Sequence, residues 1–284
     1  MIEARVFDAT PCLLGEGPLW HPARSELFWF DIRGHRLYAS DGIDRREWAF
    51  DRAVSAAGWL DADHLLLATE RDLIRFHLKT GAGELVAPLE SGNSLTRSND
   101  GRADPHGGFW IGTMGHRAQV GAGAIYRYYR GELRQLYDRI SIPNAICFTP
   151  DGGFACFADS AQQTVWRVEL DARGWPRGAP SVFLDHRTAK IAPDGAIIDA
   201  GGAFLCAEWG HRRVARYGVN GDLLEAFRLP VEYPSCPALG GSTLYVTTAR
   251  QGLPNAEEAT QAQAGMTFAI ETGLTGQPEH RVIL

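Results

Sequence analysis

Short polar turns followed by apolar, β-rich runs recur six times along this chain. The units begin at residues 21, 60, 104, 149, 199 and 239, so their starts lie 39, 44, 45, 50 and 40 residues apart. A second strand-like run follows most of them, as at 124–129, 164–170 and 213–219. A period of about 40 to 50 residues that carries several short strands is typical of a propeller blade. An all-β sandwich would not need six similar units, so the pattern predicts an all-β fold, a single six-bladed β-propeller.

The two ends of the chain fall outside the six units. The run ARVF at 4–7 precedes the first unit, and we expect it to pair with the last blade and close the ring. The C-terminal run HRVIL at 280–284 would lie next to it or compete for that place. Residues 1–284 would then form one domain whose ring is closed by N- and C-terminal strands. The longest insertion, at 251–265, is expected to be a loop or short helix near one mouth of the ring.

Composition agrees with a turn-rich globular chain. The sequence has 284 residues, 45% of them hydrophobic, with 32 Gly and 15 Pro. Its net charge of −6 argues against a nucleic-acid partner, because binding to phosphates usually needs a basic face. The N-terminal residues lack the apolar core of a signal peptide, and no apolar stretch approaches the length of a membrane helix. These features predict a cytoplasmic protein with no membrane contact and no obligate protein partner.

The five cysteines make an odd count and include no C-x-x-C pair. Disulfides are rare in a reducing cytoplasm, and cysteine zinc sites usually show close spacing. Buried free thiols are therefore expected at Cys12, Cys147, Cys156, Cys206 and Cys236.

Four oxygen-bearing side chains occupy one common position in the repeat. Six residues before the Pro or Ala of the polar turn stand Glu16, Asn99, Asn144 and Asp194. The other two units have Ala56 and Pro234 there. Equivalent positions in the blades of a propeller line the same axial tunnel, so these side chains would converge on one point. Asn and Asp also commonly start turns, but turn propensity predicts no common position, and the shared register favours a site.

Carboxylate and amide oxygens that converge on a point suit a divalent cation. Calcium, magnesium and manganese prefer such ligands, whereas zinc and iron(II) are borderline and no histidine stands at this position. The segment RSNDGRADPH at 97–106 is not an EF-hand loop, because Thr96 and Gly107 would fall at its first and twelfth positions. No G-x-S-x-G nucleophile elbow is present either. The nine histidines are scattered and are expected to be structural or exposed.

Five motifs stand in order along nearly the whole chain: LGEGPLWHPARSELFWFDI, RSNDGRADPHGGFWIGTM, IPNAICFTPDGG, APDGAIIDAGG and LYVTTAR. Together they resemble the senescence marker protein, gluconolactonase and luciferin-regenerating enzyme family. This resemblance implies a six-bladed propeller with one divalent cation at its centre and, as in many members, hydrolysis of a sugar lactone. It also implies that Glu16, Asn144 and Asp194 bind the metal and that Arg97 and Asn99 contact the substrate.

The expected reaction is metal-dependent hydrolysis of a small neutral aldonolactone, such as a glucono-, arabino- or xylonolactone, to the sugar acid. One divalent ion (Ca2+, Zn2+, Mn2+, Mg2+ or Fe2+) would polarise the carbonyl and help activate water. Asp194 is the candidate general base, since one carboxylate oxygen can hold the metal while the other accepts a proton. Two alternatives remain open: hydrolysis of a phosphotriester or aryl ester at the same metal site, and a metal-binding propeller without catalytic activity.

Further residues are predicted around the site, because loops after the second strand of each blade should open on the same face. The candidate wall residues in these loops are Met114, Asp159 and Trp209. Asp100 is expected to support Asn99 or Arg97 from behind. A broad-specificity member of the family has a Glu close to the position of Gln119, so Gln119 is a further candidate and marks a departure in one substrate contact.

Overall fold

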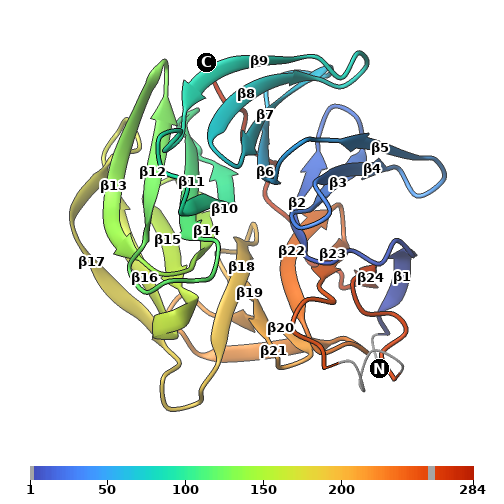
Figure 1. The fold of residues 1–284 in the computed structure, drawn as a ribbon. Helices are drawn as coiled ribbons and strands as arrows, with labels where there is room; N and C mark the ends of the chain where they lie inside the picture. Colours follow the sequence, from blue (N-terminus) through green and yellow to red (C-terminus); the bar gives the residue numbers. More distant parts are fainter. Residues whose placement is uncertain (1–2, 255–259) are drawn as a thin grey trace.

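Six four-stranded antiparallel sheets are arranged around a central axis (Figure 1). The computed structural model describes residues 3–254 and 260–284. Within these residues the one helical element is a 3-10 turn, η1 (Ser160–Gln162), and no helix is long and apolar enough to cross a membrane. The predicted six-bladed β-propeller is confirmed.

The first three blades follow the chain in order, each with its first strand nearest the axis (Figure 1). Blade 1 consists of β2 (Gly15–His21), β3 (Glu26–Asp31), β4 (Arg36–Ser40) and β5 (Arg45–Ala49). Blade 2 consists of β6 (Val54–Trp59), β7 (His64–Thr69), β8 (Asp72–His77) and β9 (Gly83–Pro88). Blade 3 consists of β10 (Thr96–Ala103), β11 (Phe109–Gly115), β12 (Gly123–Tyr129) and β13 (Glu132–Ile140).

The remaining blades complete the ring, and the last one takes a strand from the N-terminus. Blade 4 consists of β14 (Pro143–Phe148), β15 (Phe154–Asp159), β16 (Thr164–Leu170) and β17 (Pro176–Asp185). Blade 5 consists of β18 (Ala192–Ile198), β19 (Phe204–Trp209), β20 (Arg213–Tyr217) and β21 (Leu223–Arg228). Blade 6 consists of β22 (Pro234–Gly240), β23 (Thr243–Thr248), β24 (Thr267–Glu271) and the outermost strand β1 (Arg5–Asp8).

The burial of each strand follows its place in the blade. Second strands are covered on both faces by neighbouring blades, so they read as continuous apolar runs, and β11 is buried throughout. Outermost strands face solvent on one side and alternate, as RREWA does in β5. Clusters of apolar side chains fill the space between blades, and one of them joins Phe28 and Phe30 of blade 1 to Leu65 and Leu67 of blade 2. This packing holds the inner strands in place around the axis.

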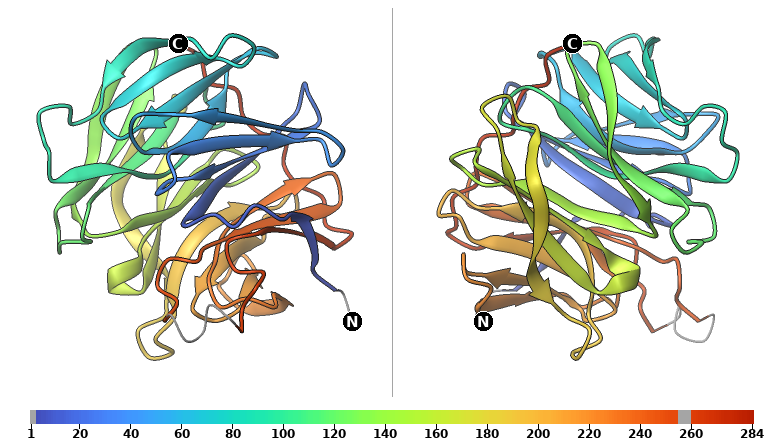
Figure 2. Two further views of the ribbon diagram at one scale, coloured as in Figure 1. Left: turned by 45° about the vertical axis from the view of Figure 1, so that its right-hand side comes forward. Right: turned by 90° about the vertical axis from the view of Figure 1, so that its left-hand side faces the viewer.

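The two chain ends lie at different blades. β1 pairs antiparallel with β24 and so attaches the N-terminal strand to blade 6. The C-terminal run does not lie beside it, contrary to the sequence expectation for 280–284. Arg281 instead forms a parallel bridge with Trp59, and Val282 is buried in the apolar cluster of blades 2 and 3. β24 already has β23 on one side and β1 on the other, and the termini lie far apart in every view (Figures 1 and 2).

Residues 275–284, here called the C-terminal segment, cross the ends of several inner strands. Nε2 of Gln277 donates to the backbone oxygens of Phe148 in blade 4 and Ile198 in blade 5, at 3.0 and 2.7 Å. Arg102 of blade 3 pairs with Glu279 at 2.7 Å. Between the segment and the strands remains a cavity of only about 30 Å³. The C-terminal segment therefore covers one end of the central tunnel.

The insertion predicted at 251–265 is described only in part. Residues 251–254 and 260–265 form turns and irregular backbone, and 255–259 lie outside the described residues. Gln251 reaches a cavity at the other end of the tunnel from the C-terminal segment.

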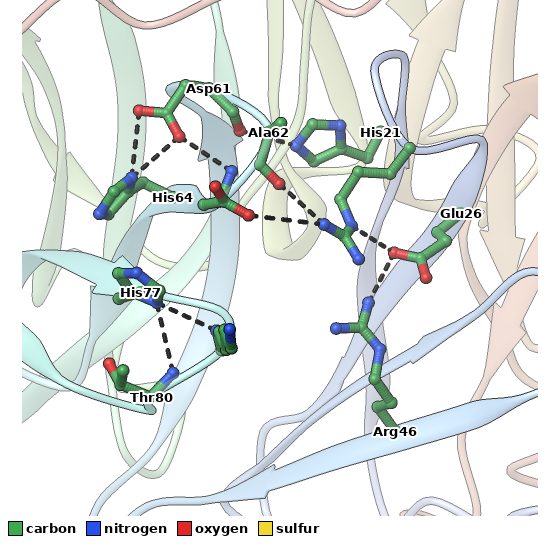
Figure 3. A network of polar contacts seen from close by, with 11 residues as sticks. His21, Glu26, Arg46, Asp61, Ala62, His64, His77 and Thr80 are labelled. Atoms are coloured by element: carbon green, nitrogen blue, oxygen red, sulfur yellow. Dashed lines mark hydrogen bonds and ion pairs between the residues drawn. The ribbon is translucent and has the colours of Figure 1, made fainter.

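Polar contacts tie the turn that ends β2 to the turn between β6 and β7 (Figure 3). Nε2 of His21 lies 3.1 Å from the backbone oxygen of Asp61, and Arg24 donates to the backbone oxygen of Ala62 at 3.0 Å. Nδ1 of His64 lies 2.9 Å from the Asp61 carboxylate. His21 thus links turns of adjacent blades and His64 holds the turn within blade 2, and both roles are structural.

Candidate metal and substrate site

The starts of the inner strands meet at the open end of the tunnel. Glu16 lies on β2, Asn99 on β10, Asn144 on β14 and Asp194 on β18. All four line one cavity of about 440 Å³, and none is more than 6% exposed. The structure therefore brings together the four residues that share one position in the sequence repeat.

The inner strands are irregular beside these polar residues. The pairing with the second strand shifts directly after Glu16 in β2 and Asn144 in β14, and β10 and β18 contain similar shifts. Gly17 and Ala145, the next residues, have φ of 55° and 56°. A bulge re-aims side chains, and a left-handed alanine costs about 1–2 kcal/mol. The backbone is thus strained at Ala145, where Asn144 turns toward the cavity, whereas Gly17 adopts the same conformation without that cost.

A chain of hydrogen bonds holds the amide side chains in place. Nη1 of Arg97 donates to Oδ1 of Asn99 at 2.8 Å, and Nδ2 of Asn99 donates to Oδ1 of Asn144 at 2.9 Å. Nδ2 of Asn144 donates to Oγ of Ser160 at 2.8 Å, and that hydroxyl donates to the backbone oxygen of Pro193 at 2.5 Å. A carbonyl oxygen has two lone pairs, so Oδ1 of Asn144 can accept this bond and still face a cation.

Three carboxylates are buried close together at this end of the tunnel. Burial and the charge of Asp100 raise the pKa of Glu16 to about 8. Burial, Glu16 and Asp100 raise the pKa of Asp194 well above its usual range, and burial raises the pKa of Asp100 to about 6. Burial, followed by the charge of Arg33, lowers the pKa of Arg97 to about 10. Like charges held out of water are unfavourable without a counter-ion, so this arrangement favours a bound cation.

The residues present fit a cation bound through oxygen. Glu16 and Asp194 supply carboxylates and Asn144 supplies an amide oxygen, the ligand types that calcium, magnesium and manganese prefer. Across residues 3–254 and 260–284 no group of three or more His, Cys, Asp or Glu side chains is arranged to hold a metal. The candidate set therefore depends on Asn144 as its third ligand, and it lacks the thiolate or imidazole ligands that zinc usually takes.

Residues 14–250 match the family model described as SMP-30/Gluconolactonase/LRE-like region. The chain belongs to this family. It is 37% identical over 287 residues to a "Putative sugar lactone lactonase" of Rhizobium meliloti (strain 1021), covering 98% of this chain and 96% of that protein. It is 33% identical over 288 residues to an L-arabinolactonase of Azospirillum brasilense, with coverage of 98% and 95%.

A solved structure shows the same fold along the whole chain. The calcium-binding protein regucalcin from Agrobacterium tumefaciens has a TM-score of 0.97 and 38% identity, and the match covers 100% of this chain and 98% of that one. The predicted membership of the SMP-30, gluconolactonase and luciferin-regenerating enzyme family is thereby confirmed.

Two of the predicted wall residues, Met114 and Trp209, line the cavity. Asp159 does not line it and is wholly buried. Its carboxylate accepts the backbone N–H groups of Ser141 and Ile142 at 2.9 and 3.0 Å. Asp159 therefore fixes the turn that leads into β14, because a buried carboxylate needs donors and the two adjacent N–H groups provide them.

Gln119 and Asp100 also differ from their expected places. Gln119 is exposed outside the cavity lining, and its Oε1 accepts the backbone N–H of Arg117 at 3.1 Å. Asp100 makes no hydrogen bond to the predicted substrate pair in the described part of the chain, and its carboxylate accepts the N–H of Ile146 at 2.8 Å. Asp100 thus joins β10 to β14, and Gln119 shapes the loop after β11.

The sequence reading missed several lining residues. They are Arg33 after β3, His116 and Arg117 after β11, Ser160 after β15, and Gln251 after β23. Each follows the second strand of its blade, which is the signal that selected the wall candidates. The same rule, applied to every blade and every polar residue, could have found them.

Proposed function

We propose that this chain catalyses the metal-dependent hydrolysis of a sugar lactone to the sugar acid. One observation carries the proposal: a single cavity holds an oxygen ligand set, Glu16, Asn144 and Asp194, together with the polar pair Arg97 and Asn99. A volume of about 440 Å³ is suitable for one sugar ring. The relatives named as lactonases support the same reaction type, a hydrolysis of carboxylic ester bonds. Glucono-, arabino- and xylonolactone are the proposed reference substrates.

Glu16, Asn144 and Asp194 would hold the ion, which when bound supplies the Lewis acidity that polarises the ester carbonyl. Calcium is the first ion to test, because the ligands are all oxygens and the regucalcin of A. tumefaciens is described as calcium-binding. Magnesium and manganese have the same ligand preference, and zinc and iron(II) serve as further comparisons.

Arg97 and Asn99 are proposed to orient the substrate. Nη1 of Arg97 donates to the backbone oxygen of Ser98 and to Oδ1 of Asn99, both at 2.8 Å, which fixes the guanidinium. Its Nε is buried without an acceptor. A buried N–H without a partner is unfavourable, so a substrate oxygen at this position would satisfy it.

Asp194 is proposed as the general base. Its carboxylate takes a proton from the attacking water while the water oxygen forms a bond to the carbonyl carbon. The bond between that carbon and the ring oxygen then breaks, and the ring oxygen receives the proton from Asp194. The products are one carboxylic acid and one hydroxyl, with no other reactant consumed.

The test is acid release from a panel of aldonolactones at constant pH, with blanks for spontaneous opening. Activity is expected to fall to the blank in chelator and to return when calcium, magnesium or manganese is added. Asp194→Asn should abolish the lactonase activity. Asp138→Asn, the same substitution at an exposed position on β13, should leave the activity unchanged. No chelator-sensitive turnover of any lactone would refute the proposal.

The same panel separates the two alternatives. An aryl ester or phosphotriester that is turned over faster than every lactone would indicate the other hydrolase activity at this metal site. Calcium binding measured by calorimetry, with no turnover of any substrate, would indicate a metal-binding propeller without catalysis.

A further inference from the structure

The cavity has a strongly basic rim above its acidic floor. Three arginines and one histidine line it, namely Arg33, Arg97, His116 and Arg117. Among residues 3–254 and 260–284, the acidic residues that line the cavity are Glu16 and Asp194, the proposed metal ligands. This concentration of positive charge lies in a chain whose net charge is −6.

Within the part of the chain that the structure describes, the rim arginines form no ion pair with a carboxylate. Among the ion pairs of the described residues, none involves Arg33, Arg97 or Arg117, and the nearby Glu70 pairs with Arg71 at 3.2 Å. Three arginines elsewhere in the blades have carboxylate partners: Arg102 pairs with Glu279, Arg127 with Asp104, and Arg213 with Glu208. The charges of Arg33 and Arg117 are therefore not tied to a carboxylate within residues 3–254 and 260–284, whereas Arg97 interacts with Glu16 and Asp194 and His116 lies 4.0 Å from Glu70.

Two neutral groups hold Arg33 in position. Its Nε donates to Oε1 of Gln251 at 3.1 Å, and its Nη2 donates to the backbone oxygen of His116 at 3.2 Å. These bonds connect loops of blades 1, 3 and 6 across the mouth. Arg117, next to His116, is exposed beside it. The fold thus holds the Arg33 guanidinium at the mouth, where Arg33 and Arg117 are both exposed to an anion from outside.

The proposed metal site at the bottom of the cavity does not require the positive charge of the rim either. A divalent cation at Glu16 and Asp194 would balance the two carboxylates by itself. A neutral lactone bound over that cation would leave the rim arginines without a partner of opposite charge. An anionic group on the sugar, placed away from the lactone carbonyl, would meet them at the mouth while the carbonyl lies at the floor.

We propose that the preferred substrate is an acidic sugar lactone, whose second anionic group is bound at the rim by Arg33 and Arg117. This inference rests on the proposed lactonase function and specifies its substrate class. A carboxylate, a phosphate or a sulfonate at the far carbon of the sugar has the required charge and hydrogen-bond acceptors. The chemistry of hydrolysis at the floor is unchanged.

The experiment compares matched lactones in the metal-loaded protein. Glucono-1,5-lactone is paired with lactones that carry a 6-carboxylate, a 6-phosphate or a 6-sulfonate, and kcat/KM is measured for each. At low salt, kcat/KM for at least one anionic lactone should exceed kcat/KM for the neutral lactone by about tenfold or more. Added salt should reduce this ratio. The double variant Arg33→Gln/Arg117→Gln should bring the ratio below about threefold.

Arg173→Gln removes one exposed charge at the turn before β17, far from the cavity lining, and should leave the ratio as in the unaltered protein. Arg33→Lys keeps the positive charge but not the two parallel donors of the guanidinium, so it should retain part of the preference for anionic lactones. Neutral lactones turned over as fast as every anionic one would overturn the inference and leave the lactonase proposal standing. An anionic preference that survives the double variant would overturn the role of Arg33 and Arg117. No lactone turnover at all would overturn the lactonase proposal itself.

Discussion

The two ends of the central tunnel are built by the same inner strands but treat polar groups in opposite ways. At the open end, Glu16 and Asp194 are buried beside a cavity of about 440 Å³, and neither forms an ion pair within residues 3–254 and 260–284. At the other end, a cavity of about 30 Å³ remains, and Arg102 is paired with Glu279 at 2.7 Å. Buried charge that lacks a partner within the chain is costly, so its persistence at one end indicates a ligand there.

The closed end shows what a purely structural polar arrangement looks like in this chain. The C-terminal segment places Gln277 over the exposed carbonyl groups of Phe148 and Ile198, and Nε1 of Trp59 donates to the backbone oxygen of Glu279 at 2.8 Å. Each of these three bonds pairs a donor with an acceptor, as buried groups in a stable fold usually do. The difference between the ends therefore lies in the buried charges, which are paired at the closed end and lack an ion-pair partner among the described residues at the open end, and substitutions can test it.

The largest expected effect is on catalysis at the open end. Asp194→Asn should lower kcat/KM for the best lactone by about a thousandfold, because it removes a proposed metal ligand that is also the proposed base. In chelator the same variant should unfold at the same temperature as the unaltered protein or higher, since it relieves repulsion with Glu16 and Asp100. Initial rates and thermal unfolding measure the two effects. A large fall in unfolding temperature with full activity would assign Asp194 to the fold.

The opposite result is expected at the closed end. Glu279→Ala leaves Arg102 buried without its partner and should lower the free energy of unfolding by about 3 kcal/mol, measured by urea denaturation. The kcat/KM below the unfolding transition should stay within about threefold, because neither residue lines the substrate cavity. Glu132→Ala, which breaks an exposed pair with Arg134, is the control and should cost less than about 1 kcal/mol. A loss of activity without loss of stability would contradict a purely structural closed end.

The contrast between the ends was only half visible in the sequence. The period of the blades fixes the strand lengths, so counting back from each turn was enough to place Glu16, Asn99, Asn144 and Asp194 at one level. The position of Arg33 depends instead on loop conformation and on bonds to Gln251 and His116, which no repeat specifies.

Tertiary contacts that the repeat does not specify also explain why the predictions for the cavity-wall residue Asp159 and for the C-terminal run were wrong. Asp159 is the last residue of the second strand of its blade, as Trp209 is, but its carboxylate turns inward because the N–H groups of Ser141 and Ile142 need an acceptor. The run at 280–284 reads as a strand, yet Val282 gains more from the apolar space between blades 2 and 3 than from a sheet edge. Sequence patterns predict where strands and turns occur. Which neighbour a side chain or strand packs against depends on the tertiary structure.

A smaller effect should appear in the pH dependence of the metal-free protein. Burial and Asp100 raise the pKa of Glu16 in the fold from about 4.5 to about 8. Between these values the folded chain holds a proton that the unfolded chain has released, so stability falls as the pH rises through this window. Glu16→Gln cannot lose a proton there. Its unfolding temperature in chelator should therefore exceed that of the unaltered protein by several degrees at pH 8 and by little at pH 4.5.

Metal should abolish this difference at the open end, because the cation replaces the proton on Glu16. Thermal unfolding with chelator and with calcium, each across the pH range, is the measurement. Glu47→Gln, an exposed glutamate in β5, serves as the control and should show the same slope as the unaltered protein. Equal slopes for Glu16→Gln and the unaltered protein in chelator would mean that the open end carries no unbalanced charge.

The smallest effect is expected from Gln119, the residue at which this chain departs from a broad-specificity member of its family. Gln119 is exposed, and its side chain holds the backbone N–H of Arg117 at 3.1 Å without lining the cavity. Removing one exposed hydrogen bond costs about 1 kcal/mol or less, so Gln119→Ala should change kcat/KM by less than about threefold for neutral lactones. Any loss should be greater for anionic lactones, because the bond positions the loop that carries Arg117. A fall in kcat/KM above about tenfold for neutral and anionic lactones alike would place Gln119 in direct contact with the sugar. The substrate site at the open end would then include the part of the loop after β11 that carries Gln119.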